Sequence, residues 1–358
     1  MRKEILLSYF PKITFNRYQA LIRQFENIDS AWKAEFSDFG NNTWEQNIIQ
    51  EFMAWRENVD ALAIERTLQK ENITTVFFTD SEYPPLLKEI HDPPLCLFVR
   101  GTLQNIQYPF AIVGTRKCTF YGKQITEEVI KNLVACNMTI VSGLALGIDG
   151  VSHEATLKHS GRTIAVLGSG VDQNTIYPGE HRHLAEKIIS QGGAVISEYP
   201  PYTKGTPYSF PRRNRIIAGM SLGTLVIEAQ ASSGSLITAQ CALEYNRDVF
   251  AVPQNITSPT AAGPNNLIKM GARVVTESQD ILDIFGLQKP TEPEAETMKG
   301  ENSEETLILQ ALSREPTHID ALLKNTPLPM TSIMSTLTLL EIKGKVRNLG
   351  SQNYILIV

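Results

Sequence analysis

The sequence predicts an α/β protein built around a doubly wound parallel sheet. Short apolar runs occur at residues 110–113 and 139–141, and a helical pattern of apolar residues separates them. Two strands joined by one helix form a βαβ unit, in which the strands are parallel. Similar runs recur at 163–167, 194–197 and 224–227, with helical patterns in most of the gaps. This repetition is typical of a sheet that carries helices on both faces.

The ends of the first two strands carry residues that suit an anionic ligand. Gly114, Arg116 and Lys117 follow the first strand, and a glycine-containing loop at 142–149 follows the second. Ligands of parallel sheets bind at the carboxyl ends of the strands. Glycine lets a ligand approach the backbone, and the N-terminus of the following helix offers free N–H groups. We therefore expect a binding site at this edge of the sheet.

The chain of 358 residues is too long for one small core, and its pattern changes along its length. We predict a helical N-terminal domain at 1–74, an extended Rossmann-type domain at 75–287 and a winged-helix domain at 304–358. The intervening segment, 288–303, has two prolines and four glutamates, so we expect a disordered linker there. The last domain is predicted from three helical patterns followed by a hairpin.

Composition excludes several classes of protein. No run of about eighteen apolar residues is present, so we expect no membrane span, and the N-terminus lacks a signal-peptide pattern. The four cysteines are scattered without CxxC spacing, which argues against a zinc site and fits a reducing cytoplasm. The net charge is −5, so any binding of nucleic acid must use a local basic patch.

The densest basic run is 210–217, where Arg212, Arg213 and Arg215 lie close together beside Asn214. Arginine presents a fixed fork of donors that suits phosphate. The alternative is a solvated surface or a structural cluster of ion pairs. A second segment, 233–239, could close over a phosphate or could be an ordinary start of a helix.

Motifs for a cofactor or for catalysis are weak. The loop Gly168-Ser-Gly170 follows a strand, but it lacks the third glycine of a dinucleotide site, and no GxxxxGK[ST] motif is present. Asp149 and His153 lie one helical turn apart, yet no nucleophile motif accompanies them, so we expect them to hold loop geometry. We predict no cofactor, no metal ligand and no catalytic residue.

Several motifs nevertheless occur together in one order along the chain. They are Gly114-Thr-Arg116, Ser142-Gly-Leu-Ala-Leu-Gly-Ile-Asp149, Tyr177-Pro178, Phe210-Pro-Arg-Arg-Asn-Arg-Ile-Ile217, Glu228, Ser233-Gly-Ser-Leu-Ile-Thr-Ala239 and Arg247-Asp-Val-Phe-Ala-Val-Pro253. This set closely resembles the DNA-processing protein A family (DprA, also called Smf). The resemblance is strong over 75–285 and less specific over the last fifty residues.

The resemblance implies a protein without catalytic activity that binds single-stranded DNA without sequence preference. It implies that the protein loads RecA recombinase onto the strand, notably in natural transformation, and that it forms a homodimer. The DNA contacts that it implies lie in the loop with Gly114 and Arg116 and in the basic run. We predict these DNA-binding residues from the two motifs and from neighbouring strand ends: Gly114, Arg116, Lys117, Ser142, Gly143, Arg162, Arg212, Arg213, Asn214 and Arg215.

The sequence differs from the family pattern at two places, and it leaves two other functions open. The loop at 11–14 lacks the glycine that many members carry in an N-terminal hairpin, and Cys118 stands where serine is common. One alternative is a Rossmann enzyme that hydrolyses a phosphoribosyl bond of a nucleotide, although no PGG loop is present. Another is a transcription factor, but the expected recognition helix at 330–342 has few cations, which favours a protein contact or weak DNA binding. Leu267, Ile268, Met270 and Val274 are either interface or core residues.

Overall fold

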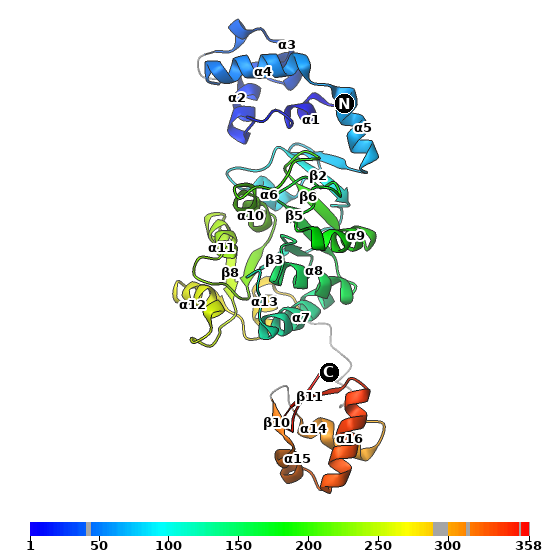
Figure 1. Cartoon of the computed structure of the whole chain (residues 1–358). Helices are drawn as coiled ribbons and strands as arrows, with labels where there is room; N and C mark the ends of the chain where they lie inside the picture. Colours follow the sequence, from blue (N-terminus) through cyan, green and yellow to red (C-terminus); the bar gives the residue numbers. More distant parts are fainter. Residues whose placement is uncertain (41–43, 289–299, 313–315, 351, 358) are drawn as a thin grey trace. The chain divides into compact units, whose positions relative to one another are not determined.

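The computed structural model of the chain describes residues 1–40, 44–288, 300–312, 316–350 and 352–357 (Figure 1). The chain divides into two compact units, Met1–Lys289 and Pro290–Val358. The domain boundaries expected from the sequence stay predictions, and most of the expected linker at 288–303 lies outside the described residues. No helix in the described part of the chain is long and apolar enough to cross a membrane.

The first unit is built on a mixed sheet, which the described residues form with nine strands in the order β1-β2-β6-β5-β4-β3-β7-β8-β9. Strands β3 to β9 run parallel to one another, while β2 pairs antiparallel with both β6 and the edge strand β1. The predicted fold class is therefore confirmed, with an antiparallel edge added to the parallel sheet. The strands are β1 Thr74–Phe77, β2 Cys96–Gly101, β3 Phe110–Val113, β4 Ile140–Ser142, β5 Thr163–Leu167, β6 Ala194–Ser197, β7 Gly223–Val226, β8 Asp248–Ala251 and β9 Arg273–Val274.

Helices cover both faces of this sheet (Figure 1). On one face α7 and α8 pack against β3 and β4 through Ile130 and Ala155, and on the other α10 and α11 pack through Ile216 and Ala239. The helices are α6 Pro85–Lys88, α7 Phe120–Ala135, α8 Ile148–Lys158, α9 Arg182–Ser190, α10 Ser209–Gly219, α11 Ser235–Glu244, α12 Ala262–Lys269 and α13 Gln279–Leu282, with short 3₁₀ turns η2 Gly179–His181, η3 Pro259–Ala261 and η4 Asp283–Phe285.

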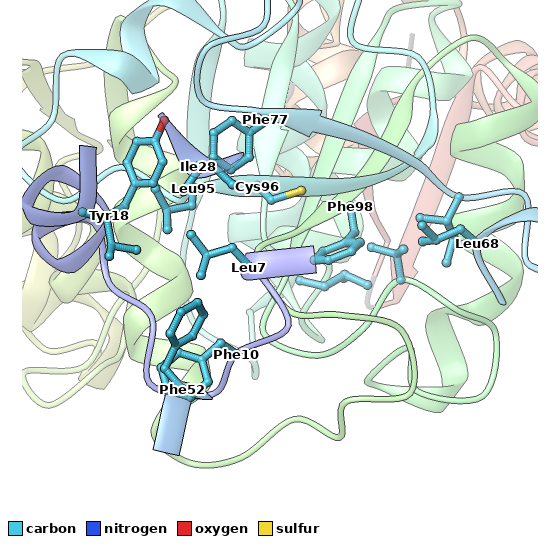
Figure 2. Packing of buried hydrophobic residues seen from close by; sticks show 14 of the residues in the cluster. Leu7, Phe10, Tyr18, Ile28, Phe52, Leu68, Phe77, Leu95, Cys96 and Phe98 are labelled. Carbon is cyan, nitrogen blue, oxygen red and sulfur yellow. The ribbon is translucent and has the colours of Figure 1, made fainter. Parts of the chain in front are cut away.

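The N-terminal helices share a core with the antiparallel edge of the sheet. Figure 2 shows Leu7 and Tyr18, from the helices, beside Phe77 and Phe98, from the strands. The ring centroids of Tyr18 and Phe77 are 5.4 Å apart, in an edge-to-face arrangement that favours aromatic pairs. The elements are α1 Lys3–Leu7, α2 Phe15–Phe25, α3 Ile28–Lys33, η1 Phe36–Asp38, α4 Gln46–Asn58 and α5 Ala61–Lys70.

The second unit has the predicted winged-helix arrangement of helices and a hairpin. Its described residues form α14 Ser303–Ala311, α15 Ile319–Asn325 and α16 Met330–Ile342, and a small sheet of β10 Thr317–His318, β11 Val346–Gly350 and β12 Asn353–Leu356. Strand β10 was not predicted, because two residues are too few to show a period. Helix α16 buries Ile333, Leu337 and Leu340 at helical spacing in the core of this unit.

Candidate nucleic-acid interface

A cleft of about 870 Å³ opens at the carboxyl ends of the central strands. From β3 the chain continues through β4, β5 and β6 on one side and returns to β7, β8 and β9 on the other. Strand β3 is therefore the point where the strand order reverses, the usual position of a ligand in such a sheet. The cleft is lined by the loop after β3, the residues before and within the first turns of α10, and the segment that opens α11.

The rim of the cleft, which we define as loop 114–119 after β3, carries two exposed cations, Arg116 and Lys117. The Arg116 guanidinium carbon lies 5.9 Å from the centre of the Phe210 ring, and the centre of the Tyr177 ring lies 5.4 Å from that of Phe210. An arginine over an aromatic face keeps its charge available to a ligand while the ring supports its side chain. The rim thus combines positive charge with aromatic surface, which is the combination that single-strand sites use.

The floor of the cleft, which we define by Arg213 and Asp149, is buried. Arg213 has an exposed fraction of only 5%, and its Nη1 donates to the carbonyl of Gly143 at 2.5 Å and to that of Val166. Burial lowers the pKa of Arg213 to about 10, against the opposing effect of Asp149. The guanidinium therefore joins the ends of β4 and β5 from inside the protein.

Asp149 completes this floor, and His153, one helical turn further along α8, is buried toward the amino end of β5. Burial raises the pKa of Asp149, although nearby Arg213 and the N–H groups of Gly143 and Ala145 oppose that shift. The His153 Nδ1 lies 2.7 Å from the Thr163 hydroxyl oxygen, and burial lowers the pKa of His153 to about 3. Neither side chain is placed as an exposed acid or base.

The basic run on α10 divides between two environments. Arg213 and Asn214 line the cleft, whereas Arg212 and Arg215, three residues apart and so on one helix face, line a different groove. The Arg215 Nη2 donates to a carboxylate oxygen of Glu198 at 2.6 Å, and the Arg212 Nε lies 3.6 Å from the other oxygen. Arg212 and Arg215 therefore form a cluster of ion pairs with Glu198, which is the alternative that the sequence left open for this basic run.

The other predicted residues are also distributed unevenly. Gly114 lies at the rim, where a Cβ would come within 2.6 Å of the Ile148 side chain. Ser142 is buried and donates to the Ile112 carbonyl at 2.7 Å, and Gly143 leaves room for Arg213, since a Cβ there would lie 2.2 Å from its Nη1. Arg162 precedes β5, at the opposite edge of the sheet from the cleft, and donates to the Thr102 carbonyl at 2.6 Å.

The prediction missed residues that shape the cleft from the far wall. Gln230, Ser232 and Ser233 line it, so the start of segment 233–239 faces the cleft. The predicted DNA-binding residues leave out Glu228, although the motif set contains it; Glu228 follows β7 and accepts a hydrogen bond from the Thr119 N–H at the end of the rim loop. Its carboxylate occupies the neighbourhood of the α7 N-terminus, where the sequence had suggested N–H groups for a ligand.

Comparison with known proteins identifies the family. The family model described as DNA recombination-mediator protein A matches residues 74–286, and that of the DprA winged helix domain matches 288–351. The chain belongs to the DprA/Smf family. It is 43% identical to protein Smf of Escherichia coli over 74% of this chain and 73% of that protein. It is 36% identical to protein Smf of Synechocystis over 93% of both chains.

Solved structures of DprA proteins match the fold as well. The X-ray structure of DprA from Streptococcus pneumoniae aligns with a TM-score of 0.66 at 34% identity, over 79% of this chain and 98% of that one. DprA from Helicobacter pylori aligns with a TM-score of 0.53 at 29% identity, over 60% of this chain and 95% of that one. The latter was determined for its single-stranded DNA binding mode.

The DprA winged-helix tail shows little positive charge on its expected recognition helix. The exposed side of α16 carries Met334, Leu339 and Ile342. Lys343, directly after the helix, is paired with Glu301 at 2.7 Å and with Glu305 at 2.8 Å. Binding of duplex DNA depends on cations that neutralise phosphates, so the expectation of a protein contact or weak DNA binding by this domain stays a prediction.

Proposed function

We propose that this protein binds single-stranded DNA without sequence preference in the cleft between β3 and β7, and that it passes the strand to RecA recombinase in DNA uptake or recombination. The observation that carries the proposal is the pair of exposed cations, Arg116 and Lys117, above a cleft at the switch point of the sheet. The relative from Helicobacter pylori, described by its single-stranded DNA binding mode, supports it.

The chemistry of the cleft favours a single strand over a duplex. Its polar lining includes backbone of loop 114–119 and the hydroxyls of Ser232 and Ser233, which can meet phosphate and sugar without reading a sequence. Tyr177 and Phe210 add ring surface for unstacked bases. The bases of a duplex are paired and stacked, so they cannot enter a cleft without first being flipped out.

The proposal also includes a homodimer, a cytoplasmic location and no enzymatic role. Met270 and Val274 are 74% and 43% exposed beside the edge strand β9, whereas Leu267 is buried, so the first two are the interface candidates. Exposed apolar residues at a sheet edge favour association. All four cysteines are described as thiols, which is compatible with a reducing compartment.

The test is a fluorescence-anisotropy titration of labelled poly-dT against a matched duplex, without nucleotide, at about 50 and 200 mM salt. We expect preference for the single strand and an affinity that falls by ~0.7 decade per decade of salt for each neutralised phosphate. Arg116→Ala should weaken binding roughly tenfold, since it removes a charge-assisted contact. Arg66→Ala, which removes an exposed arginine from α5, is the matched control.

Equal binding of duplex, or full affinity after Arg116→Ala, would contradict the proposed site. Light scattering of the same samples measures the dimer, and the rate of RecA assembly on the coated strand measures loading. Turnover of a nucleoside monophosphate in a parallel screen would instead support the nucleotide-hydrolase alternative.

A further inference from the structure

Loop 114–119, which carries Arg116 and Lys117, is fixed at both ends by one residue, Glu228. The Thr115 N–H donates to the backbone carbonyl of Glu228 at 2.7 Å. Four residues later the Thr119 N–H donates to the Glu228 Oε2 at 2.8 Å, and the Thr119 hydroxyl donates to Oε1 at 2.7 Å. The carbonyl and the carboxylate of the same residue thus hold the two ends of the segment between which the cations lie.

Glu228 is itself held firmly. Its exposed fraction is 1%, and Oε1 accepts a further hydrogen bond from the Thr260 hydroxyl at 3.1 Å. Its carboxylate lies against the first turn of α7, because a Cβ on Gly122 would come within 2.3 Å of Oε2. A carboxylate at a helix N-terminus interacts favourably with the helix dipole. The anchor is therefore a rigid internal group.

The opposite side of the loop is packed against the start of α8. The Ile148 N–H donates to the Thr115 carbonyl at 3.2 Å, and a Cβ on Gly147 would lie 2.2 Å from that same oxygen. With α8 on one side and Glu228 on the other, the backbone of the rim has little freedom. A cation on a fixed loop loses less conformational entropy when it binds a ligand.

We infer that Glu228 is a positioning residue for DNA binding, which acts by fixing the loop that presents Arg116. The inference rests on the proposed function and assigns it a residue that makes no contact with DNA. The direction in which the affinity for DNA should change is the opposite of the usual one. Removal of a negative charge near a DNA site ordinarily strengthens binding, because phosphates are repelled less. Here, removal of the Glu228 carboxylate should weaken binding.

The experiment is a double-mutant cycle between Glu228→Gln and Arg116→Ala, read by anisotropy of labelled poly-dT. Glutamine keeps the shape of the side chain but replaces one acceptor oxygen with a donor, which opposes the N–H or the hydroxyl of Thr119. We expect Glu228→Gln to raise Kd roughly fivefold in the wild-type background and by no more than about twofold once Arg116 is alanine, because only Lys117 then remains on the loop. Residues that act through one another show this non-additivity, and independent residues do not.

Glu127→Gln is the matched control for charge. Glu127 lies on α7, is exposed and pairs with Lys158 at 3.2 Å, so its replacement removes one negative charge from the helix whose first turn the Glu228 carboxylate contacts. We expect its Kd to stay within about twofold of wild type or to fall slightly. All variants are compared at a temperature below their unfolding transitions, and their active fractions are measured by stoichiometric titration.

Unchanged or tighter binding by Glu228→Gln would overturn the inference, as would an equal loss in the Arg116→Ala background. Both results presuppose that the wild type binds the strand; if it does not, the proposed function fails instead. If Glu228→Gln does not fold, Thr119→Val can be used instead, because it removes the hydroxyl that donates a hydrogen bond to Glu228. Thr119→Ser keeps a hydroxyl at this position. Weaker binding by the valine variant with recovery in the serine variant supports the inference, and equal binding by both contradicts it.

Discussion

The rim and the floor of the cleft both contain arginine, but the two environments give it opposite roles. On the rim, Arg116 is exposed and rests on the Phe210 ring. In the floor, Arg213 is buried and its Nη1 donates to the carbonyls of Gly143 and Val166. An exposed guanidinium keeps its donors for a phosphate, whereas Arg213 already gives its Nη1 donors to carbonyl oxygens and its Nε donor to Asn214.

The comparison separates affinity from stability. A surface cation contributes little to folding but contributes to DNA binding through the release of counterions. A buried cation is costly to desolvate, so the fold retains it only where hydrogen bonds and a nearby acid compensate, as Asp149 does for Arg213. We therefore expect substitutions in the floor to change the free energy of unfolding and substitutions on the rim to change Kd.

The largest effect should follow from Arg213→Ala. The change removes hydrogen bonds that join the ends of β4 and β5 and leaves buried Asp149 without its neighbouring cation. We expect the free energy of unfolding to fall by about 3 kcal/mol. Urea unfolding followed by far-UV circular dichroism measures it.

Arg212→Ala, one residue earlier on α10, is the control for this experiment. Its side chain is 48% exposed and lies 3.6 Å from Glu198, so the cost should stay below about 0.5 kcal/mol. Similar losses in the two variants would show that burial does not distinguish these arginines. A stable Arg213→Ala variant with lower affinity and a smaller salt slope would instead make Arg213 a direct phosphate contact.

Sequence periodicity was sufficient to predict the fold, because the apolar runs alternate with amphipathic segments along the first unit. It also placed Gly114, Arg116 and Lys117 at the carboxyl end of a strand, and the strand order of the structure shows that this strand is the switch point. What it could not supply was the direction in which α10 faces. The spacing of Arg212 and Arg215 puts them on one face, but their partner Glu198 comes from after β6 and is brought there by tertiary structure.

Two further differences have local physical causes. Arg162 precedes the apolar run of β5, so its distance from the cleft follows from strand direction, which the sequence already contained. The burial of Arg213 did not follow from any local pattern, since it depends on the absence of a side chain at Gly143 and on the carbonyl of Val166. A dense run of arginines therefore does not by itself predict a DNA site, because backbone carbonyls far away in the sequence can bind one of the arginines inside the protein.

A second effect on stability should appear in acid, at a buried residue away from the cleft. His153 is buried, and burial lowers its pKa to about 3, whereas an unfolded histidine titrates near ~6.5. At a pH between these two pKa values, His153 is protonated in the unfolded state and neutral in the folded state. Stability is therefore complete above about pH 6.5 and falls as the pH decreases, by about 2 kcal/mol at pH 5.

His153→Gln should flatten this dependence of stability on pH, because glutamine does not titrate. His183→Gln, which replaces an exposed histidine at the start of α9, should leave the dependence unchanged. Urea unfolding at pH 5 and pH 7.5 gives both values for each variant. An equally steep dependence in His153→Gln would assign the acid sensitivity to other groups.

The smallest effect belongs to the rim. Lys117 is exposed, and only its backbone N–H, which donates to the Thr115 hydroxyl at 3.2 Å, is tied into the loop. Lys117→Ala should therefore leave the free energy of unfolding within about 0.5 kcal/mol of wild type. It should raise Kd for poly-dT about threefold at low salt and reduce the salt slope by up to ~0.7, as expected for the loss of one phosphate contact. Lys131→Ala, which removes an exposed lysine near the far end of α7, controls for net charge alone. If both lysine variants changed the salt slope equally, the rim would act only through the overall electric field of the protein. If Lys117→Ala alone changed the slope, Lys117 would contact a phosphate directly. The distinction between a rim that binds DNA and a floor that stabilises the fold would then extend to the residue with the smallest expected effect.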